Sequence, residues 1–267
     1  MPYIVLTFDD FSRDIAKVMD VLKSVGIKGV FFISTASIKN YEEQNLVKEL
    51  AKYHEIGSHA HNHLDLTQLP LGEILHDLIK SKEIIYNLTG KYVKSFAYPY
   101  GMHNGKVLEA VRKAGFTVAR TIEVEPPLVE IEDPLRLPVF FHDYTLTNKR
   151  LVYEVLRNFF ASKYYISKLY WIMLIKKQKG FLETAKSLLN FMANLHQFSN
   201  SLLIFLFHPW MIERLKAWET FEEVALLAKS MGSVITLEEA YDKFYVRNKI
   251  QGNEKYTGLH RLSRGLL

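Results

Sequence analysis

Three histidines alternate with other residues over five positions, within residues 57–65 (Gly-Ser-His-Ala-His-Asn-His-Leu-Asp). Neutral imidazole is the commonest nitrogen ligand of zinc-like ions, and a metal held by two histidines and one carboxylate keeps positions open for water and substrate. A helical turn aligns residues i and i+4, whereas an extended segment aligns every second residue. His59 and His63 satisfy both geometries, so they are the favoured metal-binding pair. A surface histidine cluster is the alternative interpretation.

Two adjacent carboxylates, Asp9 and Asp10, follow an apolar run over residues 3–8. Successive side chains of a strand point to opposite faces, so the two carboxylates diverge. One of them can bind a metal while the other hydrogen-bonds water. The pair therefore offers a third ligand for the histidines and a candidate general base, with a turn-forming Asp pair as the alternative.

Strands alternate with helices along most of the chain. The apolar patterns predict strands at residues 3–8, 29–33, 55–57, 93–98, 116–119, 202–207 and 233–236. Helices are predicted between them, with Ser12, Asn104 and Thr220 as N-caps and Gly26 as a C-terminal stop. This order predicts an α/β fold, a distorted (β/α)-barrel of about seven parallel strands. Function is expected at the carboxyl ends of its strands.

The sequence predicts one domain over residues 1–245, with a helical insertion at about 151–199 and a basic tail at 246–267. The insertion carries an apolar run, residues 169–175, that is too short to span a bilayer. A core or lid helix is the first interpretation. Weak contact with a membrane surface, through the flanking Lys168, Lys176 and Lys177, is the alternative.

Composition excludes several classes of protein. The 267 residues contain no cysteine, so neither disulfides nor thiolate ligands or nucleophiles are available. The net charge of +5 is spread along the chain without a nucleic-acid-binding motif, so no nucleic-acid partner is expected. The first ten residues lack the features of a secretory signal, which favours a cytoplasmic location. Composition does not specify the oligomeric state.

Four separated motifs resemble those of the polysaccharide deacetylases, the NodB-homology family also called carbohydrate esterase family 4. The resemblance extends over about residues 5–237, in the order of the family. The motifs are Thr7-Phe8-Asp9-Asp10, then His59 to Leu66 with its second histidine at His63, then Phe96 to Gly101, and finally Leu206-Phe207-His208.

This resemblance implies a role for each matching residue. The implied metal ligands are Asp10, His59 and His63, the general base is Asp9, and the general acid is His208. Tyr100 and Pro99 are the implied substrate or oxyanion residues, with a backbone N–H near Tyr100 as the oxyanion donor. The implied activity is metal-dependent hydrolysis of N-acetyl groups on a sugar or glycan, with release of acetate. Zinc is the default metal, and nickel or cobalt would accept the same ligands. His61 and His103 are interpreted as bystanders.

The sequence departs from the family pattern in three places. Phe11 replaces the glycine that usually follows the Asp pair, and Ala97 stands where an arginine usually orients the base. The Asp and Trp of the fourth motif are not evident around residues 117–125. Arg120 is expected to reach Asp9 from a neighbouring strand in place of the missing arginine. Trp210 or Trp171 is the candidate for the missing tryptophan.

Two other functions fit the same residues. The first is hydrolysis of a small non-sugar amide or imide on this fold, which the departures at Phe11 and Ala97 favour. The second is a catalytically silent glycan-binding module. Because Asp9 and His208 are both present, the sequence shows no loss of the catalytic pair.

Overall fold

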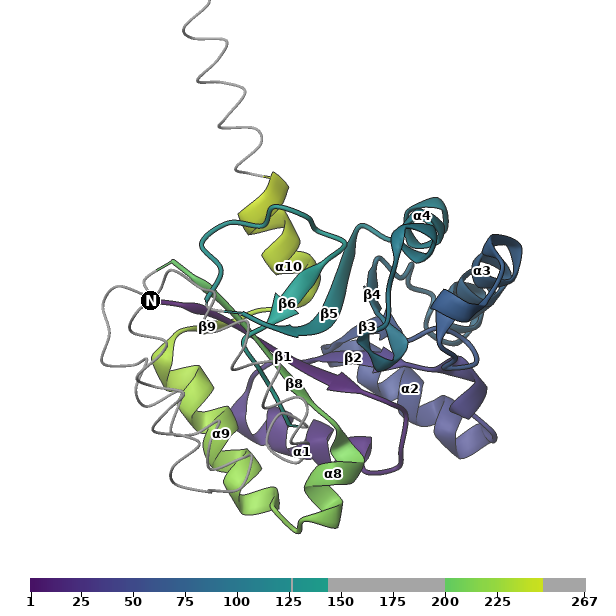
Figure 1. Ribbon diagram of the computed structural model, residues 1–267. Coiled ribbons are helices and arrows are strands. Elements are labelled where there is room, and N and C mark those ends of the chain that lie inside the picture. Colours follow the sequence, from purple (N-terminus) through teal and green to yellow (C-terminus); the bar gives the residue numbers. More distant parts are fainter. Residues whose placement is uncertain (126, 144–199, 247–267) are drawn as a thin grey trace, which may run out of the picture.

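The computed structural model describes residues 1–125, 127–143 and 200–246. The helical insertion predicted at 151–199 and, apart from Val246, the predicted basic tail lie outside the described residues. Figure 1 shows strands in the interior of the molecule, with helices packed around them. Within the described ranges, no helix is long and apolar enough to cross a membrane.

The strands form one parallel sheet in the order β6-β5-β4-β3-β2-β1-β8-β7, with β9 beside β1. Their bounds are β1 Tyr3–Asp9, β2 Val30–Ile33, β3 Glu55–Ser58, β4 Ser95–Ala97, β5 Val118–Val124, β6 Leu137–Val139, β7 Phe141–His142, β8 Leu202–Phe207 and β9 Ser233–Val234. The end strands β6 and β7 do not pair with each other, but β6 approaches β8, so the sheet is a nearly closed barrel. The predicted (β/α)-barrel is confirmed.

The described part of the chain has two strands more than the sequence predicted. These are β6 and β7, which have three and two residues and therefore show no detectable periodicity. The strand predicted at 116–119 begins two residues later, as β5. Its first predicted residue, Phe116, instead donates its amide to the carbonyl of Val111 at the end of the preceding helix.

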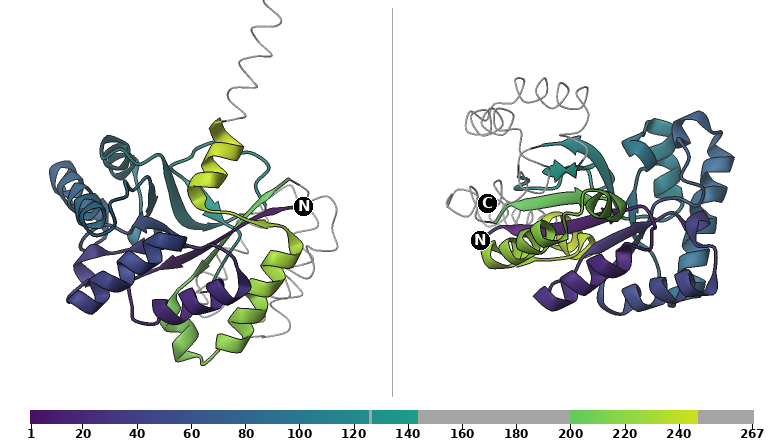
Figure 2. Two further views of the ribbon diagram at one scale, coloured as in Figure 1. Left: turned by 180° about the vertical axis from the view of Figure 1, so that it is seen from behind. Right: turned by 90° about the horizontal axis from the view of Figure 1, so that it is seen from below.

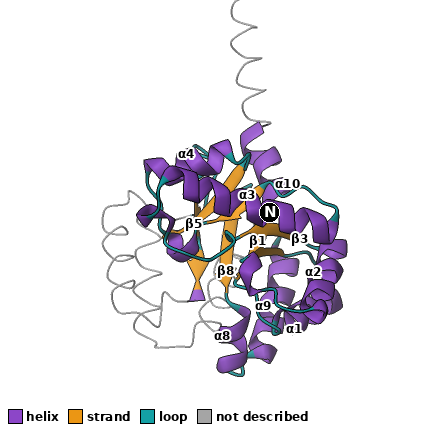
Figure 3. Cartoon of the chain, turned by 90° about the vertical axis from the view of Figure 1, so that its right-hand side faces the viewer, coloured by secondary structure: helices purple, strands orange, loops and turns teal. Residues whose placement is uncertain are grey.

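Helices cover the outside of the barrel, as Figures 2 and 3 show from three further directions. Their bounds are α1 Ile15–Val25, α2 Tyr41–Tyr53, α3 Leu71–Thr89, α4 Gly105–Lys113, α8 Pro209–Arg214, α9 Trp218–Met231 and α10 Leu237–Tyr241. Neighbouring helices pack in the series α9-α1 and α2-α3-α4. Every second residue of β1, Ile4, Leu6 and Phe8, contributes to the core beneath the helices.

Helix ends follow the predicted signals only in part. The side chain of Asn104 accepts the Val107 amide, and Gly26 ends α1 in the left-handed conformation, as predicted. Ser12 is not an N-cap, because its hydroxyl lies 3.3 Å from Asp14 and α1 begins at Ile15. Thr220 is not one either. A left-handed residue at Lys216 turns the chain directly into α9, which places Thr220 inside the helix.

Helix α10 and the turn after it fill the inside of the barrel at the amino ends of its strands. Leu237, Ala240 and Phe244, in α10 and the turn after it, pack against inward-facing residues of β1, β2 and β8. Glu55 at the start of β3 accepts the amide of Glu238 in α10, 3.0 Å away, which places this helix beside the first residues of the strands. The carboxyl ends of the strands are left for the site.

Glu55 makes the stability of this closed end depend on pH. Burial raises the pKa of its carboxyl group to about 7, although the Glu238 amide opposes the shift. The folded state therefore favours protonated Glu55, and this contribution is lost as the pH rises from about 4.5 through about 7. We expect Glu55→Gln to reduce the fall in unfolding free energy between pH 5 and pH 8 by about 2 kcal/mol, measured by urea denaturation.

The exposed Glu49 on α2, which pairs with Lys52, provides the matched control. Glu49→Gln should leave the pH dependence of the unfolding free energy as in the unsubstituted protein. An unchanged pH dependence in Glu55→Gln would show that ionisation of Glu55 in the folded protein does not lower the free energy of unfolding.

Candidate active site

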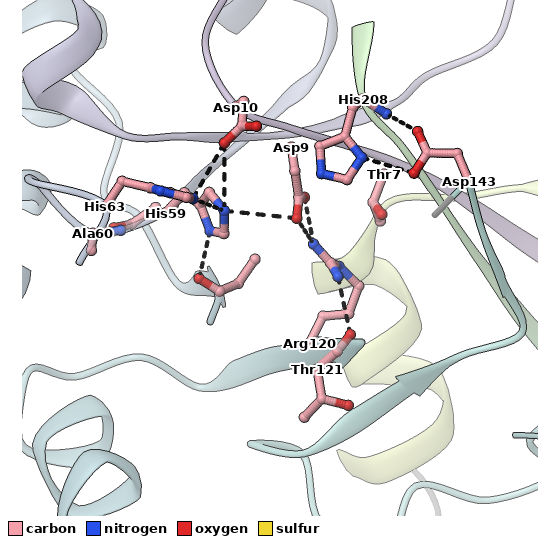
Figure 4. A network of polar contacts seen from close by, with 12 residues as sticks. Thr7, Asp9, Asp10, His59, Ala60, His63, Arg120, Thr121, Asp143 and His208 are labelled. Carbon is pink, nitrogen blue, oxygen red and sulfur yellow. Dashed lines mark hydrogen bonds and ion pairs between the residues drawn. The ribbon is translucent and has the colours of Figure 1, made fainter. Parts of the chain in front are cut away.

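The motif residues gather at the carboxyl ends of the central strands. Asp9 is the last residue of β1, His59 directly follows β3, and His208 directly follows β8. Strands β1 and β8 are paired with Phe8 opposite Phe207, so Asp9 and His208 lie at the same level of neighbouring strands. Figure 4 shows Asp9 between the His59 side of the site and His208.

Asp10, His59 and His63 form a group of three converging ligand atoms. The two Nε2 atoms of the imidazoles are 3.1 Å apart, and Asp10 Oδ1 lies 3.3 Å from His63 Nε2 and 3.9 Å from His59 Nε2. All three atoms lie within 4.8 Å of one another. Two imidazoles bound to one ion at usual distances hold their nitrogens about 3.0 to 3.4 Å apart, so this geometry fits a divalent metal.

The protonation state of His59 also suits a ligand. Its Nδ1 donates a hydrogen bond to the carbonyl of Ala97, 2.8 Å away, which leaves the lone pair of Nε2 directed at the group. Burial lowers the pKa of His59 to about 4, with a further contribution from His63, so the ring is neutral near pH 7. The side chain of Ala97 has no part in this contact, because the backbone supplies the acceptor.

Several residues around the group adopt left-handed backbone conformations that side chains other than glycine rarely tolerate. They are Asp10 (φ 64°), Ala60 (φ 62°), His63 (φ 53°) and Tyr100 (φ 57°). Such residues cost about 1 kcal/mol or more each and persist where the surrounding structure holds them. Their concentration at the strand ends marks this region as a functional site.

Asp77 of α3 holds the histidine loop from behind. Its buried carboxylate accepts the amides of His61 (2.6 Å) and Asn62 (3.2 Å) and the Asn62 side-chain amide (2.6 Å). Sequence reasoning missed Asp77. The available signal was an acidic residue between the apolar positions Ile74 and Leu78 on the inner face of a helix.

Asp9 is paired with a buried arginine. Nη2 of Arg120 contacts both carboxylate oxygens of Asp9 and lies 2.5 Å from Oδ2, while Nη1 donates to the Thr121 carbonyl. Burial raises the pKa of Asp9, but Arg120, His59 and His208 together lower it below its ordinary value. Arg120 lies within β5, not after the strand as predicted. Its function as the group that orients the base stays a prediction.

His208 has a carboxylate partner that sequence reasoning also missed. Nδ1 of His208 donates to Oδ1 of Asp143 over 2.8 Å, and its backbone amide donates to Oδ2 over 2.6 Å. Although burial lowers it, Asp143 raises the pKa of His208 above its ordinary value. Asp143 follows β7, beyond the region searched for a fourth motif. The sequence feature that could have identified Asp143 is an apolar run that ends in an acidic residue, like the run that ends at Asp9.

The other predicted residues lie around this centre. Tyr100 follows the buried Pro99 in a short turn after β4. Tyr100 is exposed, and the centroid of its ring is 4.6 Å from the centroid of the His63 ring. The indole Nε1 of Trp210 donates to Asp10 Oδ2 over 3.2 Å. Trp171 lies outside the described residues. Phe11 packs against the core beneath the helices.

The two additional histidines lie apart from the converging ligand atoms. Nδ1 of His61 is 2.8 Å from the Thr35 hydroxyl, and Nδ1 of His103 is 3.1 Å from the Gly101 carbonyl. Neither belongs to the group formed by Asp10, His59 and His63. Their interpretation as bystanders stays a prediction.

The fold is that of the family 4 carbohydrate esterases. Residues 1–119, less than half of the chain, match the model of the polysaccharide deacetylase family. The peptidoglycan-N-acetylglucosamine deacetylase PgdA of Listeria monocytogenes is 33% identical over 111 residues, which are 40% of this chain and 23% of that protein. The peptidoglycan-N-acetylmuramic acid deacetylase PdaA of Bacillus subtilis is 32% identical over 117 residues, 42% of this chain and 44% of that protein.

Both matches cover less than half of the relatives' length. Among solved structures, a family 4 acetyl xylan esterase from Clostridium thermocellum, in complex with a cobalt ion, superimposes with a TM-score of 0.59. The superposition covers 90% of each chain at 16% sequence identity. At this identity the similarity establishes the shared barrel.

Proposed function

We propose that this protein is a metal-dependent hydrolase that removes N-acetyl groups from an N-acetylated sugar or glycan. The observation that supports this most strongly is the convergence of Asp10, His59 and His63 beside Asp9, with His208 on the neighbouring strand. The deacetylase relatives over the first part of the chain support the same reaction. The cytoplasmic location favoured by the N-terminal sequence stays a prediction.

Asp10, His59 and His63 would hold one divalent ion. Zinc is proposed because it accepts two imidazoles and a carboxylate and leaves positions open, and nickel or cobalt would accept the same ligands. When bound, the ion supplies Lewis acidity to an amide carbonyl and to a water molecule. The remaining steps are carried by the side chains of this chain.

Asp9 would act as the general base. Arg120 holds its carboxylate ionised and fixed in orientation, and a carboxylate retains lone pairs for a further hydrogen bond. It would accept the proton of the water that attacks the acetyl carbon. The negative charge that develops on the carbonyl oxygen would be stabilised by a backbone N–H near Tyr100.

His208 would act as the general acid. Nδ1 donates to Asp143, so Nε2 is proposed as the nitrogen that gives up the proton, and the raised pKa favours the imidazolium. Nε2 would protonate the amide nitrogen as its bond to the acetyl carbon breaks. The products are acetate and the free amine.

The pH dependence of the reaction tests this assignment. A general acid must be protonated, so activity should be lost as the pH rises through the raised pKa of His208. Asp143→Asn removes the charge that raises this pKa, so the alkaline limb of kcat/KM should move to lower pH. The measurement is a pH–rate profile from pH 5 to 10.

The exposed Asp133 provides the control, because its carboxylate caps a turn by accepting the Leu135 amide. Asp133→Asn should leave both limbs of the profile unchanged. An alkaline limb that stays in place in Asp143→Asn would contradict the role of His208 as general acid.

The proposed function itself is tested by element analysis of the purified protein, followed by acetate release from a panel of N-acetylated sugars and small amides. We expect one divalent ion per chain, acetate from at least one N-acetylated sugar, and loss of activity on chelation that added zinc restores. Protein without metal would overturn the metal dependence. Release only from small amides would favour the second function, and a metal-loaded protein inactive on the whole panel would favour a silent binding module.

A further inference from the structure

The two carboxylate oxygens of Asp10 have different partners. Oδ1 faces the imidazole nitrogens of His63 and His59, at 3.3 and 3.9 Å. Oδ2 accepts the indole N–H of Trp210 at 3.2 Å. A carboxylate whose second oxygen is already bound presents one oxygen, not two, to an ion.

Asp10 needs such a partner because its own backbone does not determine the orientation of its side chain. It has a left-handed φ of 64°, and about a third of its side chain, 31%, is exposed to solvent. Its strand neighbour Asp9, in contrast, is buried and bound to Arg120. A partly exposed carboxylate can adopt more than one rotamer, so a hydrogen bond to Oδ2 selects one of them.

Trp210 is placed firmly enough to make this selection. It follows Pro209, the buried first residue of α8, and the carbonyl of His208 accepts the amides of Met211 and Ile212 at the start of this helix. The indole packs against the core beneath the helices, with its centroid 5.7 Å from that of His208. Trp210 therefore spans the space between the proposed acid and the converging ligand atoms.

We infer that Trp210 is a positioning residue for Asp10: its indole N–H holds Oδ2, so that Oδ1 alone is presented to the ion as the third ligand. The inference rests on the proposed metal-dependent function. Groups that orient a metal ligand in this way typically change metal affinity 10- to 100-fold when they are removed. The helix that follows the acid would thus also set the affinity for the metal.

The test is a Co²⁺ titration of the full chain, in competition with a chelator. Trp210→Phe keeps the ring and removes the N–H, and we expect its affinity for Co²⁺ to fall by about 10-fold or more. The visible absorption bands of the bound Co²⁺ should also change, because Asp10 would be free to bind through both oxygens. Trp218→Phe is the matched control, since its indole donates to Glu213 on the surface and should not affect the metal.

A Trp210→Phe affinity within twofold of the unsubstituted protein would overturn the inference and leave the proposed function standing. Absence of Co²⁺ and Zn²⁺ binding by the unsubstituted protein would overturn both. If Trp210→Phe does not fold, indole N–H NMR signals of the unsubstituted protein decide the matter, with the three tryptophans assigned through Trp171→Phe and Trp218→Phe. Zinc should shift the Trp210 signal and not that of Trp218; an unmoved Trp210 signal in zinc-loaded protein would overturn the inference.

Discussion

Replacement of Arg120 by methionine is expected to lower the free energy of unfolding by about 3 to 5 kcal/mol at pH 7, because it leaves the Asp9 carboxylate buried without its cation. The pKa of Asp9 is lowered in the folded protein, so its ionised form contributes stability above the unfolded pKa, and this contribution is lost as the pH falls through the folded pKa. The deficit of the variant should therefore shrink below about pH 4. Urea denaturation at pH 7 and pH 3.5 measures both effects.

The exposed Arg136 serves as the control, and Arg136→Met should change the unfolding free energy by no more than about 0.5 kcal/mol. A double variant provides a second check. Because Asp9→Asn removes the charge that Arg120→Met leaves unpaired, the double variant should be more stable than Arg120→Met alone. Equal losses in Arg120→Met and Arg136→Met would show that the buried pair contributes nothing.

Asp9→Asn is expected to reduce kcat for acetate release by about 100- to 10,000-fold, because an amide of the same shape cannot accept the proton of the attacking water. KM and the metal content should change little, since Asp10, His59 and His63 are intact. Acetate release at saturating substrate and element analysis of the same sample are the measurements. Circular dichroism confirms that the variant is folded, because Arg120 also loses its partner.

Asp65→Asn, at the cap of the short helical turn after the histidine loop, is the matched control and should retain normal turnover. Turnover above one tenth of normal in Asp9→Asn would exclude Asp9 as the base. The orienting function of Arg120 is tested separately. If Arg120→Met kept normal turnover while Asp9→Asn lost it, Arg120 would be a structural residue only.

The sequence predicted best those features that short-range patterns determine. The continuous apolar run of β8 was predicted with its observed bounds, because a strand buried on both faces needs apolar residues at every position. The spacing of His59 and His63 likewise indicated a pair whose ring nitrogens lie together in the structure. Both signals are contained within a few residues.

The sequence failed where a contact joins distant segments. Asp143 is 65 residues from His208, and the short strand before it has no periodicity to mark its end. Asp77 is 15 and 16 residues from the amides that it accepts. Local patterns contain no information about which backbone a buried carboxylate will meet. Such partners emerge only when the helices and strands have packed.

Strand register accounts for the position of the arginine. Strands β4 and β5 are paired with Ala97 directly opposite Arg120. The cation therefore lies at the same level as the expected residue but one strand further along the sheet, and the long arginine side chain spans the additional distance to Asp9. The expectation that Arg120 would reach Asp9 from a neighbouring strand was wrong, because β5 is next to β4 and β6 and three strands separate it from β1. A sequence without a register cannot identify such a facing residue.

The single peptide bond between Asp9 and Asp10 ties the proposed base to a proposed metal ligand more tightly than the proposed acid is tied to either. It holds the Cα atoms of the proposed base and the proposed metal ligand about 3.8 Å apart, whatever the rest of the barrel does. His208 is joined to them through the backbone ladder between β1 and β8 and through Trp210. A displacement of β8 along β1 would therefore misplace the proton donor His208 and the indole that holds Asp10, while the backbones of Asp9 and Asp10 would stay together.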